Sequence, residues 1–310
     1  MDIAFMGTPD FAVPSLERLI GSRHRIAGVV TRPDRPKGRG RRMVAPPVKE
    51  VALAHGLNTV QPDSLKDPAF LGVLRGWSPD VIVVVSFRIL PSEVIEVPAR
   101  GVVNVHPSLL PRYRGSAPIN WAIIRGESET GVTTFFIVPK VDSGSIILQR
   151  TVPIGPDETA GELSGRLKGV GAELLLDTLE HIDDGTAHPY PQCEHEVSLA
   201  PKLTKEDARI DWSEEAESIR NLIRGTNPWP GAFTTWQGED LKVHRAAVAQ
   251  GATEAHPGEI ILADAKLGVK VAARQGGLWL AEIQPAGRRR MASAEWVRGH
   301  SVRAGDKLGE

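Results

Sequence analysis

Continuous apolar runs recur through the first half of this chain, and they constrain its fold more than any other feature. They lie at residues 3–7, 26–30, 80–86 and 101–106, and helical patterns lie between them, for example over 46–56. A run rich in valine and isoleucine, without polar alternation, is typical of a strand covered on both faces, as in a parallel sheet. The first half therefore predicts an α/β domain with a mostly parallel sheet and helices on both of its faces.

The pattern changes in the second half. A further strand is predicted over 131–138, and a long amphipathic helix from Thr159 to Ile182. The stretch after it is polar, contains prolines and has no clear period, so we predict an interdomain linker over 189–207. A helix over 214–225 then precedes five short strands, which predict a small β-barrel; they lie at 232–236, 241–249, 258–263, 268–274 and 277–284. We therefore expect two domains, over 1–188 and 208–310.

Composition excludes several classes of protein. The 310 residues are 41% hydrophobic and 24% charged, as in a soluble globular protein. No stretch of about 18 or more apolar residues is present, and the N-terminus lacks a basic region followed by an apolar run. We therefore expect neither a membrane span nor a signal peptide. The single cysteine, Cys193, cannot form an internal disulfide, which favours the reducing cytoplasm.

Two polar side chains end the apolar run at 101–106. Asn104 and His106 are two positions apart, so in a strand they point to the same face, at the carboxyl end where parallel sheets bind ligands. An amide and an imidazole can stabilise an oxygen on which negative charge develops, and the imidazole can also lend a proton. Asp142 follows the strand over 131–138. Because the ends of neighbouring parallel strands lie together, we expect its carboxylate to orient His106 and to accept a proton from a nucleophile.

The residues alone leave a structural interpretation open, because an isolated histidine is more often structural and Asp-Ser-Gly is a common turn. Several other chemistries are disfavoured. Gly7-Thr8-Pro9 is not a dinucleotide-binding motif, no P-loop is present, and without G-x-S-x-G Ser108 is a poor hydrolase nucleophile. Cys193 and His195 fit no common zinc spacing, so we expect no metal.

Basic residues gather at 32–42, although the net charge of the chain is −1. This stretch has six basic residues and a single acidic residue, Asp34, together with glycines and few apolar side chains. It predicts a mobile basic finger whose target is phosphate. A second run, Arg288 to Arg290, is consistent with a solvated loop or with a contact to a partner.

Several segments together resemble the methionyl-tRNA formyltransferase family. "NVHPSLLPRYRG", from residue 104, is similar to the signature of enzymes that transfer formyl from 10-formyltetrahydrofolate. The resemblance implies a Rossmann-like catalytic domain, an OB-like C-terminal barrel and an enzyme that formylates the α-amino group of initiator methionyl-tRNA. Nothing in the sequence demands more than a monomer. Further similar segments occur in both halves of the chain, at 5–16, 31–42, 141–144, 199–212 and 219–233.

The resemblance also implies roles for single residues. The catalytic trio of the family matches Asn104, His106 and Asp142. The folate-contacting loop of the family matches Ser108-Leu109-Leu110-Pro111, and Phe87-Arg88-Ile89-Leu90 is expected to line the pterin pocket. The loop with which the family grips tRNA matches the basic stretch, so the positions expected to bind tRNA there are Arg35, Lys37, Arg39, Arg41 and Arg42. Arg288, in the second basic run, is expected to bind tRNA as well.

One segment departs from the family. Many members have tyrosine-glycine where this chain has Phe87-Arg88, and the segment here is closer to glycinamide ribonucleotide formyltransferase. A formyltransferase acting on an amino sugar nucleotide or on glycinamide ribonucleotide is therefore the alternative within the same chemistry. Alternatives from other classes are a nucleic-acid-binding module on an inactive scaffold, which would not need the trio, and a folate-dependent hydrolase, which would release formate without an acceptor.

Overall fold

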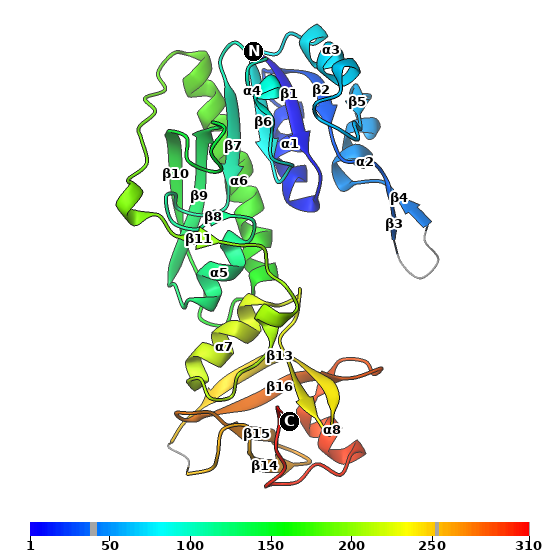
Figure 1. The fold of residues 1–310 in the computed structure, drawn as a ribbon, viewed down its shortest axis with the longest axis vertical. Coiled ribbons are helices and arrows are strands. Elements are labelled where there is room, and N and C mark those ends of the chain that lie inside the picture. Colours follow the sequence, from blue (N-terminus) through cyan, green and yellow to red (C-terminus); the bar gives the residue numbers. More distant parts are fainter. Residues whose placement is uncertain (38–41, 252–253, 310) are drawn as a thin grey trace. The chain divides into compact units, whose positions relative to one another are not determined.

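A seven-stranded sheet forms the centre of the first part of the chain in the computed structural model (Figure 1). Its strands lie in the order β10-β9-β7-β6-β1-β2-β5. All neighbours from β5 to β7 are parallel, whereas β9 is antiparallel to β7 and β10 is antiparallel to β9. The predicted mostly parallel sheet is thus confirmed. The strands are β1 Asp2–Gly7, β2 Arg25–Val30, β5 Thr59–Val60, β6 Val81–Val85, β7 Val102–His106, β9 Glu129–Phe136 and β10 Ile146–Pro153.

Burial on both faces explains the continuous apolar runs. All five residues of β6 are buried. On one face, Val84 and Val102 share a core with α3 (Pro68–Gly76) and α4 (Ser92–Ile95). On the other face α6 (Ala160–Asp183) approaches so closely that a side chain at Gly171 would lie 3.0 Å from Val105. Each face of the sheet is therefore covered by helices, as predicted.

The other helices and short strands surround this sheet. α1 (Val13–Ile20) follows β1, and α2 (Pro47–Ala54) follows the basic stretch, where the helical pattern over 46–56 predicted a helix. β3 (Arg35–Lys37) and β4 (Arg42–Val44) form an antiparallel pair, and β8 (Arg114–Gly115) pairs in parallel with β11 (Leu199–Ala200). The remaining short elements are α5 Pro118–Ile124 and the 3-10 helices Asp10–Ala12, Glu194–Glu196 and Glu206–Ala208.

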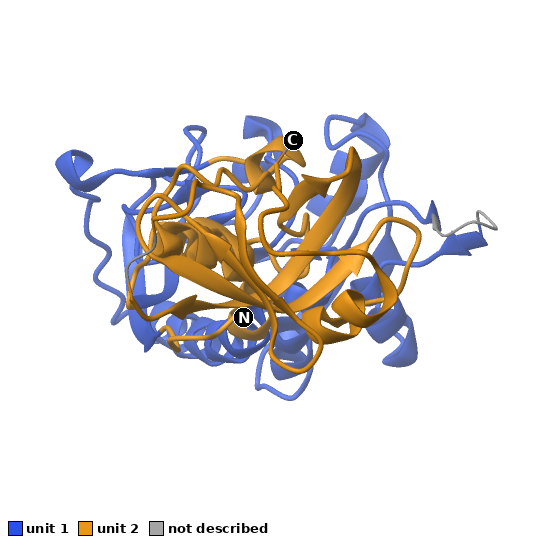
Figure 2. Ribbon diagram, turned by 90° about the horizontal axis from the view of Figure 1, so that it is seen from below, with its two compact units in different colours: residues 1–118, 129–153, 164–200 blue, residues 119–128, 154–163, 201–310 orange. Residues whose placement is uncertain are grey.

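The structure describes residues 1–37, 42–251 and 254–309, and these divide into two units (Figure 2). Unit 1 contains residues 1–118, 129–153 and 164–200, and unit 2 contains residues 119–128, 154–163 and 201–310. The short segments 119–128 and 154–163 therefore belong to unit 2, although the chain on either side of each belongs to unit 1. The predicted linker over 189–207 divides between the units after Ala200.

The first turn of α6 lies in unit 2, and local hydrogen bonds determine where the helix begins. Glu162 accepts a hydrogen bond from the backbone N of Thr159, and Glu162 N in turn bonds the Thr159 hydroxyl. This reciprocal pair is a capping box, which satisfies amide donors that the first turn of a helix leaves free.

The C-terminal part of unit 2 is an antiparallel β structure, as predicted. Its strands lie in the order β12-β13-β16-β15-β14, and β17 pairs with β16. Their bounds are β12 Phe233–Trp236, β13 Glu239–Ala249, β14 Ile260–Asp264, β15 Gly268–Ala272, β16 Gly277–Pro285 and β17 Met291–Ala292. Ile219 and Ile223 of α7 (Ala216–Gly225) and Trp296 of α8 (Ser293–Gly299) pack into one core with these strands. Within the described ranges, no helix is long and apolar enough to cross a membrane.

Candidate active site

β7 brings Asn104 and His106 to one face of the sheet, where both line a cavity of about 450 Å³. The segment that follows β6, residues 86–90, and the loop over 137–142 form much of the remaining wall. The cavity thus lies beyond the carboxyl ends of β6 and β7, where open α/β sheets bind ligands. The Asn104 amide makes no hydrogen bond to another described residue, so both of its hydrogens are available to a ligand.

His106 is held in one orientation. Its Nε2 lies 2.9 Å from the backbone oxygen of Tyr113, and the residue is only 4% exposed. A carbonyl oxygen only accepts hydrogen bonds, so we assign the hydrogen of the neutral ring to Nε2. Phe135 packs against the imidazole edge-to-face, with 6.4 Å between the ring centroids. The nitrogen that remains for chemistry is therefore Nδ1.

Asp142 lies opposite that nitrogen. Its Oδ2 is 3.9 Å from His106 Nδ1 and accepts a hydrogen bond of 2.9 Å from the backbone N of Gly115. The distance to Nδ1 is too long for a hydrogen bond but short enough for attraction to a protonated imidazole. The carboxylate is mostly buried, with 14% of its side chain exposed. Asn104, His106 and Asp142 thus line the same cavity.

The backbone around this cavity is strained. Asp142 has a φ of 48°, Tyr113 of 62° and Ser86 of 49°, in the left-handed region that residues other than glycine rarely adopt. Each such residue costs about 1–3 kcal/mol and persists only where its surroundings hold it. Gly144 is also required, because a Cβ there would lie 1.7 Å from the backbone oxygen of Phe136. Strain of this kind is typical of functional sites.

The geometric reason for expecting Asp142 at the site proves wrong. β9 is antiparallel to β7, so His106 lies beside Thr133, and Phe136, at the end of β9, lies beside Val103. The carboxyl end of β9 therefore points away from that of β7. Asp142 instead reaches His106 because the loop after β9 turns back, with Phe136 N donating to Ser145 O.

The segment Ser108 to Pro111 lies behind His106, and in the described structure its four residues are not part of the cavity wall. Ser108 is fully buried, and its hydroxyl donates to the backbone oxygen of Arg112. Leu110 N donates to the hydroxyl of Thr133, which itself donates to Ser108 O. These bonds fix the path of the chain that returns to the Tyr113 carbonyl. The segment therefore holds the backbone next to His106 and does not itself line the cavity.

The segment Phe87 to Leu90, by contrast, lines the cavity. Arg88 stacks on the Phe87 ring at 5.2 Å and donates to the backbone oxygens of Pro62 and Asp63. Burial, and then the nearby charge of Arg32, lower the pKa of its guanidinium. The side chain of Arg88 is therefore tied to a neighbouring loop.

Sequence reasoning missed part of the cavity wall. Ile137, Val138 and Val141 line the cavity, although Val138 and Val141 are 40% and 49% exposed. The signal was an apolar run that continues beyond the end of β9. Arg32, the first residue of the basic stretch, also lines the cavity.

The residues expected to bind tRNA are only partly described. Arg35 in β3 and Arg42 in β4 are exposed, and Lys37 lies in β3. Arg39 and Arg41 lie outside the described residues. Arg288, in unit 2, is exposed as well. Asp34, the acidic residue of the stretch, pairs with Lys49 at 2.8 Å, so its charge is already compensated.

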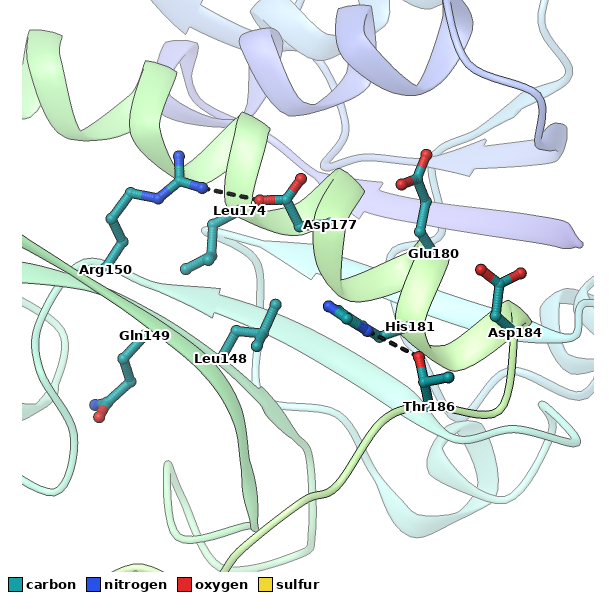
Figure 3. Close-up of a pocket in the computed structure, with 9 residues that line it drawn as sticks. All are labelled: Leu148, Gln149, Arg150, Leu174, Asp177, Glu180, His181, Asp184 and Thr186. Carbon is teal, nitrogen blue, oxygen red and sulfur yellow. Dashed lines mark hydrogen bonds and ion pairs between the residues drawn. The ribbon is translucent and has the colours of Figure 1, made fainter.

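A second hollow of about 430 Å³ lies between α6 and β10 (Figure 3). Neither Asn104 nor His106 lines it. Its lining arginine and its histidine already have partners. Arg150 pairs with Asp177 at 2.8 Å, and His181 Nδ1 lies 2.8 Å from the Thr186 hydroxyl. The hollow contains no strained backbone of the kind found beside His106. The cavity at the end of β7 is therefore the better candidate for the reaction.

Solved structures share this fold. WlaRD, a sugar 3N-formyl transferase, has a TM-score of 0.67 and 18% identity, with 93% of this chain and 99% of that chain covered. HypX from Aquifex aeolicus, in complex with tetrahydrofolic acid, has a TM-score of 0.65 and 20% identity, with 95% of this chain covered. This chain spans only 46% of HypX.

Sequence comparison is more specific. A family model described as Formyl transferase matches residues 1–179, and one described as Formyl transferase, C-terminal domain, matches residues 202–301. The methionyl-tRNA formyltransferase of Moorella thermoacetica is 47% identical over 310 residues, covering 100% of this chain and 99% of the relative. That of Acetivibrio thermocellus is 44% identical over 311 residues, covering both proteins completely. The chain belongs to the methionyl-tRNA formyltransferase family, as the sequence resemblance predicted.

Proposed function

We propose that this chain transfers the formyl group of 10-formyltetrahydrofolate to the α-amino group of initiator methionyl-tRNA, giving N-formylmethionyl-tRNA for translation initiation. The main support is that Asn104, His106 and Asp142 surround one cavity in a chain related over its whole length to methionyl-tRNA formyltransferases. The amide, imidazole and carboxylate of these residues supply the groups that acyl transfer needs, so the proposed reaction requires no metal.

Asn104 and His106 stabilise negative charge during the reaction. The neutral amine of methionyl-tRNA attacks the formyl carbon, and its oxygen becomes an oxyanion. The free amide of Asn104 and a protonated His106 Nδ1 both donate from the wall of the cavity toward this oxygen. Donors that are already in place cost no reorganisation, and removing one typically lowers turnover by about 10²–10³-fold.

Asp142 moves the proton. The attacking nitrogen must lose a proton, and N10 of the folate must gain one as its bond to the formyl carbon breaks. The Asp142 carboxylate lies within 3.9 Å of His106 Nδ1 and is held by Gly115 N. It therefore stabilises the imidazolium and is placed to carry the proton from the amine to N10, directly or through water.

The two predicted folate segments have different parts in this proposal. Phe87 to Leu90 line the cavity with apolar side chains beside the stacked Phe87 and Arg88, which suits the flat pterin ring of a folate. Ser108 to Pro111 act indirectly, by fixing the backbone that leads to Tyr113. The Tyr113 carbonyl in turn holds His106.

The tRNA contacts are assigned to exposed cations. Arg35 and Arg42, on the β3–β4 pair, present positive charge to a phosphate backbone, and Arg288 does so in unit 2. Residues 1–188 then form the catalytic domain and 208–310 a domain that contacts tRNA. All cavity residues come from unit 1 of one chain, so a monomer suffices, acting in the cytoplasm where tRNA is charged.

The test is formyl transfer from 10-formyltetrahydrofolate to charged initiator methionyl-tRNA. Wild type should be active, His106→Ala should lose turnover, and Arg42→Ala should chiefly raise KM for tRNA. Transfer to an amino sugar nucleotide or to glycinamide ribonucleotide instead would keep the chemistry and reject the substrate. Release of formate without any acceptor would indicate a hydrolase.

A further inference from the structure

Residues 190–200, called here the strap, are attached to unit 1 at both ends. At one end the backbone N and O of Tyr190 pair with those of Ile146, at 3.0 and 2.8 Å. At the other end β11 pairs with β8, which contains Gly115. The strap therefore spans from the strand after the Asp142 loop to the segment that bonds the Asp142 carboxylate.

Gln192 lies in the middle of the strap, and its side-chain amide meets the Asp142 loop. Its Nε2 donates to the backbone oxygens of Asp142 and Gly144, each at 2.8 Å. These two carbonyls flank the turn in which Asp142 adopts its positive φ. Both hydrogens of the Gln192 amide are thus donated to the backbone of the loop that carries the Asp142 carboxylate.

Arg114 holds the other end of the same amide. Its Nε and Nη2 donate to Gln192 Oε1 at 3.0 and 2.7 Å, and Nη2 also lies 3.1 Å from Glu194. Arg114 is only 5% exposed, and a buried guanidinium needs such partners. The pair of bonds fixes which way the amide of Gln192 points, because the oxygen must face the guanidinium. The donors must then face Asp142 and Gly144.

The strap also holds Tyr113, whose carbonyl positions His106. The Ser198 hydroxyl accepts a hydrogen bond of 2.9 Å from Tyr113 N, and Ser198 O accepts one from Arg114 N. The carbonyl of that same Tyr113 receives Nε2 of His106. One segment therefore supports the backbone behind both His106 and Asp142.

We propose that Gln192, oriented by Arg114, is a positioning residue for the formyl transfer reaction and acts by holding the Asp142 backbone so that its carboxylate stays beside His106. The inference rests on the proposed function and deepens it. Gln192 does not line the cavity in the described structure, so it acts through Asp142 and not on the substrate.

Two variants separate its bonds. Gln192→Met keeps the length of the side chain and removes every hydrogen bond. Gln192→Glu keeps an acceptor for Arg114 and removes the donors to the two carbonyls. Both should lower kcat by about 10²-fold, since a misplacement of about 1 Å has that effect, while KM for tRNA and folate changes little. Asn120→Ala is the control: it removes an amide-to-carbonyl bond to Gly225 in unit 2 and should keep kcat.

A double-mutant cycle gives the decisive kinetic readout. If Gln192 acts through Asp142, adding Gln192→Met to Asp142→Asn should cause no further loss of kcat, because the two effects are not independent. A merely structural role would give losses that multiply. Multiplying losses, or a change in KM alone, would overturn the proposal.

Amide hydrogen exchange tests the same idea without the reaction. The Gly115 amide, bonded to the Asp142 carboxylate, and the Phe136 amide should exchange faster in Gln192→Met than in wild type or Asn120→Ala. Unchanged exchange would reject the positioning role. If wild type fails to formylate methionyl-tRNA, the proposed function fails, and the exchange result alone still decides the role of Gln192.

Discussion

The assignment of Nδ1 as the reacting nitrogen of His106 can be tested by two substitutions that each keep one nitrogen position. An asparagine amide extends about as far from the backbone as Nδ1 does, and a glutamine amide about as far as Nε2. His106→Asn therefore retains a donor that faces Asp142 and the cavity. His106→Gln retains a donor to the Tyr113 carbonyl, which Nε2 contacts at 2.9 Å in the wild type.

We expect His106→Asn to lose mainly stability and His106→Gln to lose mainly turnover. His106→Asn leaves the buried Tyr113 carbonyl without its partner, which should lower the free energy of unfolding by about 1–3 kcal/mol. His106→Gln keeps that bond but removes the donor to the oxyanion, so its kcat should fall by about 10²–10³-fold, or roughly 2.7–4 kcal/mol in the barrier. His106→Asn keeps a neutral donor without a transferable proton, and its kcat should lie between those of wild type and His106→Gln.

The assay is single-turnover formyl transfer with both substrates saturating, together with urea unfolding of each variant. Single-turnover conditions report the chemical step and not product release. Should His106→Gln retain turnover while His106→Asn loses it, the reacting nitrogen is Nε2 and the assignment from the Tyr113 bond is wrong. Equal losses in both variants would show that the charge or proton of the imidazole matters and the position of the donor does not.

Three further predictions follow from the structure. Gly144→Ala should displace the Asp142 loop and lower kcat by about 10²-fold, whereas Gly165→Ala, in α6 with open space around it, should leave kcat unchanged in the same transfer assay. Arg35→Ala with Arg42→Ala should reduce the slope of log affinity for tRNA against log salt by about 0.7–0.9 per lost contact, measured by filter binding, with kcat unchanged at saturating tRNA. Burial lowers the pKa of His244. Below about pH 6.5 the unfolded chain therefore binds a proton at this histidine that the folded chain does not bind. The free energy of unfolding should then fall with falling pH by up to about 1.4 kcal/mol per pH unit. His244→Asn should flatten that dependence in urea unfolding at pH 5.5 and 7.5, and an unchanged slope would contradict it.

The parallel part of the sheet was predictable because burial on both faces leaves a mark in composition. The run Val81–Val85 is apolar throughout, and all of it is buried. Direction leaves no such mark. β9 is buried from Thr130 to Phe135, as its neighbours are, yet it is antiparallel to β7. Periodicity reports which residues are covered, and it carries no information on which way the chain enters a sheet.

The three polar residues that line the cavity could be chosen from the sequence for a different reason. Asn104 and His106 interrupt an apolar strand, where a polar side chain needs a partner or a ligand, and so they stand out in the sequence. Asp142 was chosen for its chemistry and only then given a geometric reason, which the antiparallel β9 contradicts. Residue type indicated what could react, but it did not indicate how the loop brings the group there.

The strap shows why the geometry of the site could not be predicted from the sequence. Its polar stretch has no period, because its side chains bond to backbone atoms distant in the chain: Gln192 to Asp142 over 50 residues, and Ser198 to Tyr113 over 85. Those two partners are also where the backbone is strained. A strained turn persists only when such bonds hold it, so the same contacts that stabilise unit 1 also keep Asp142 beside His106. Part of the predicted linker thus belongs to unit 1 through its hydrogen bonds, and under the proposal for Gln192 a substitution in it should change turnover before it changes the fold.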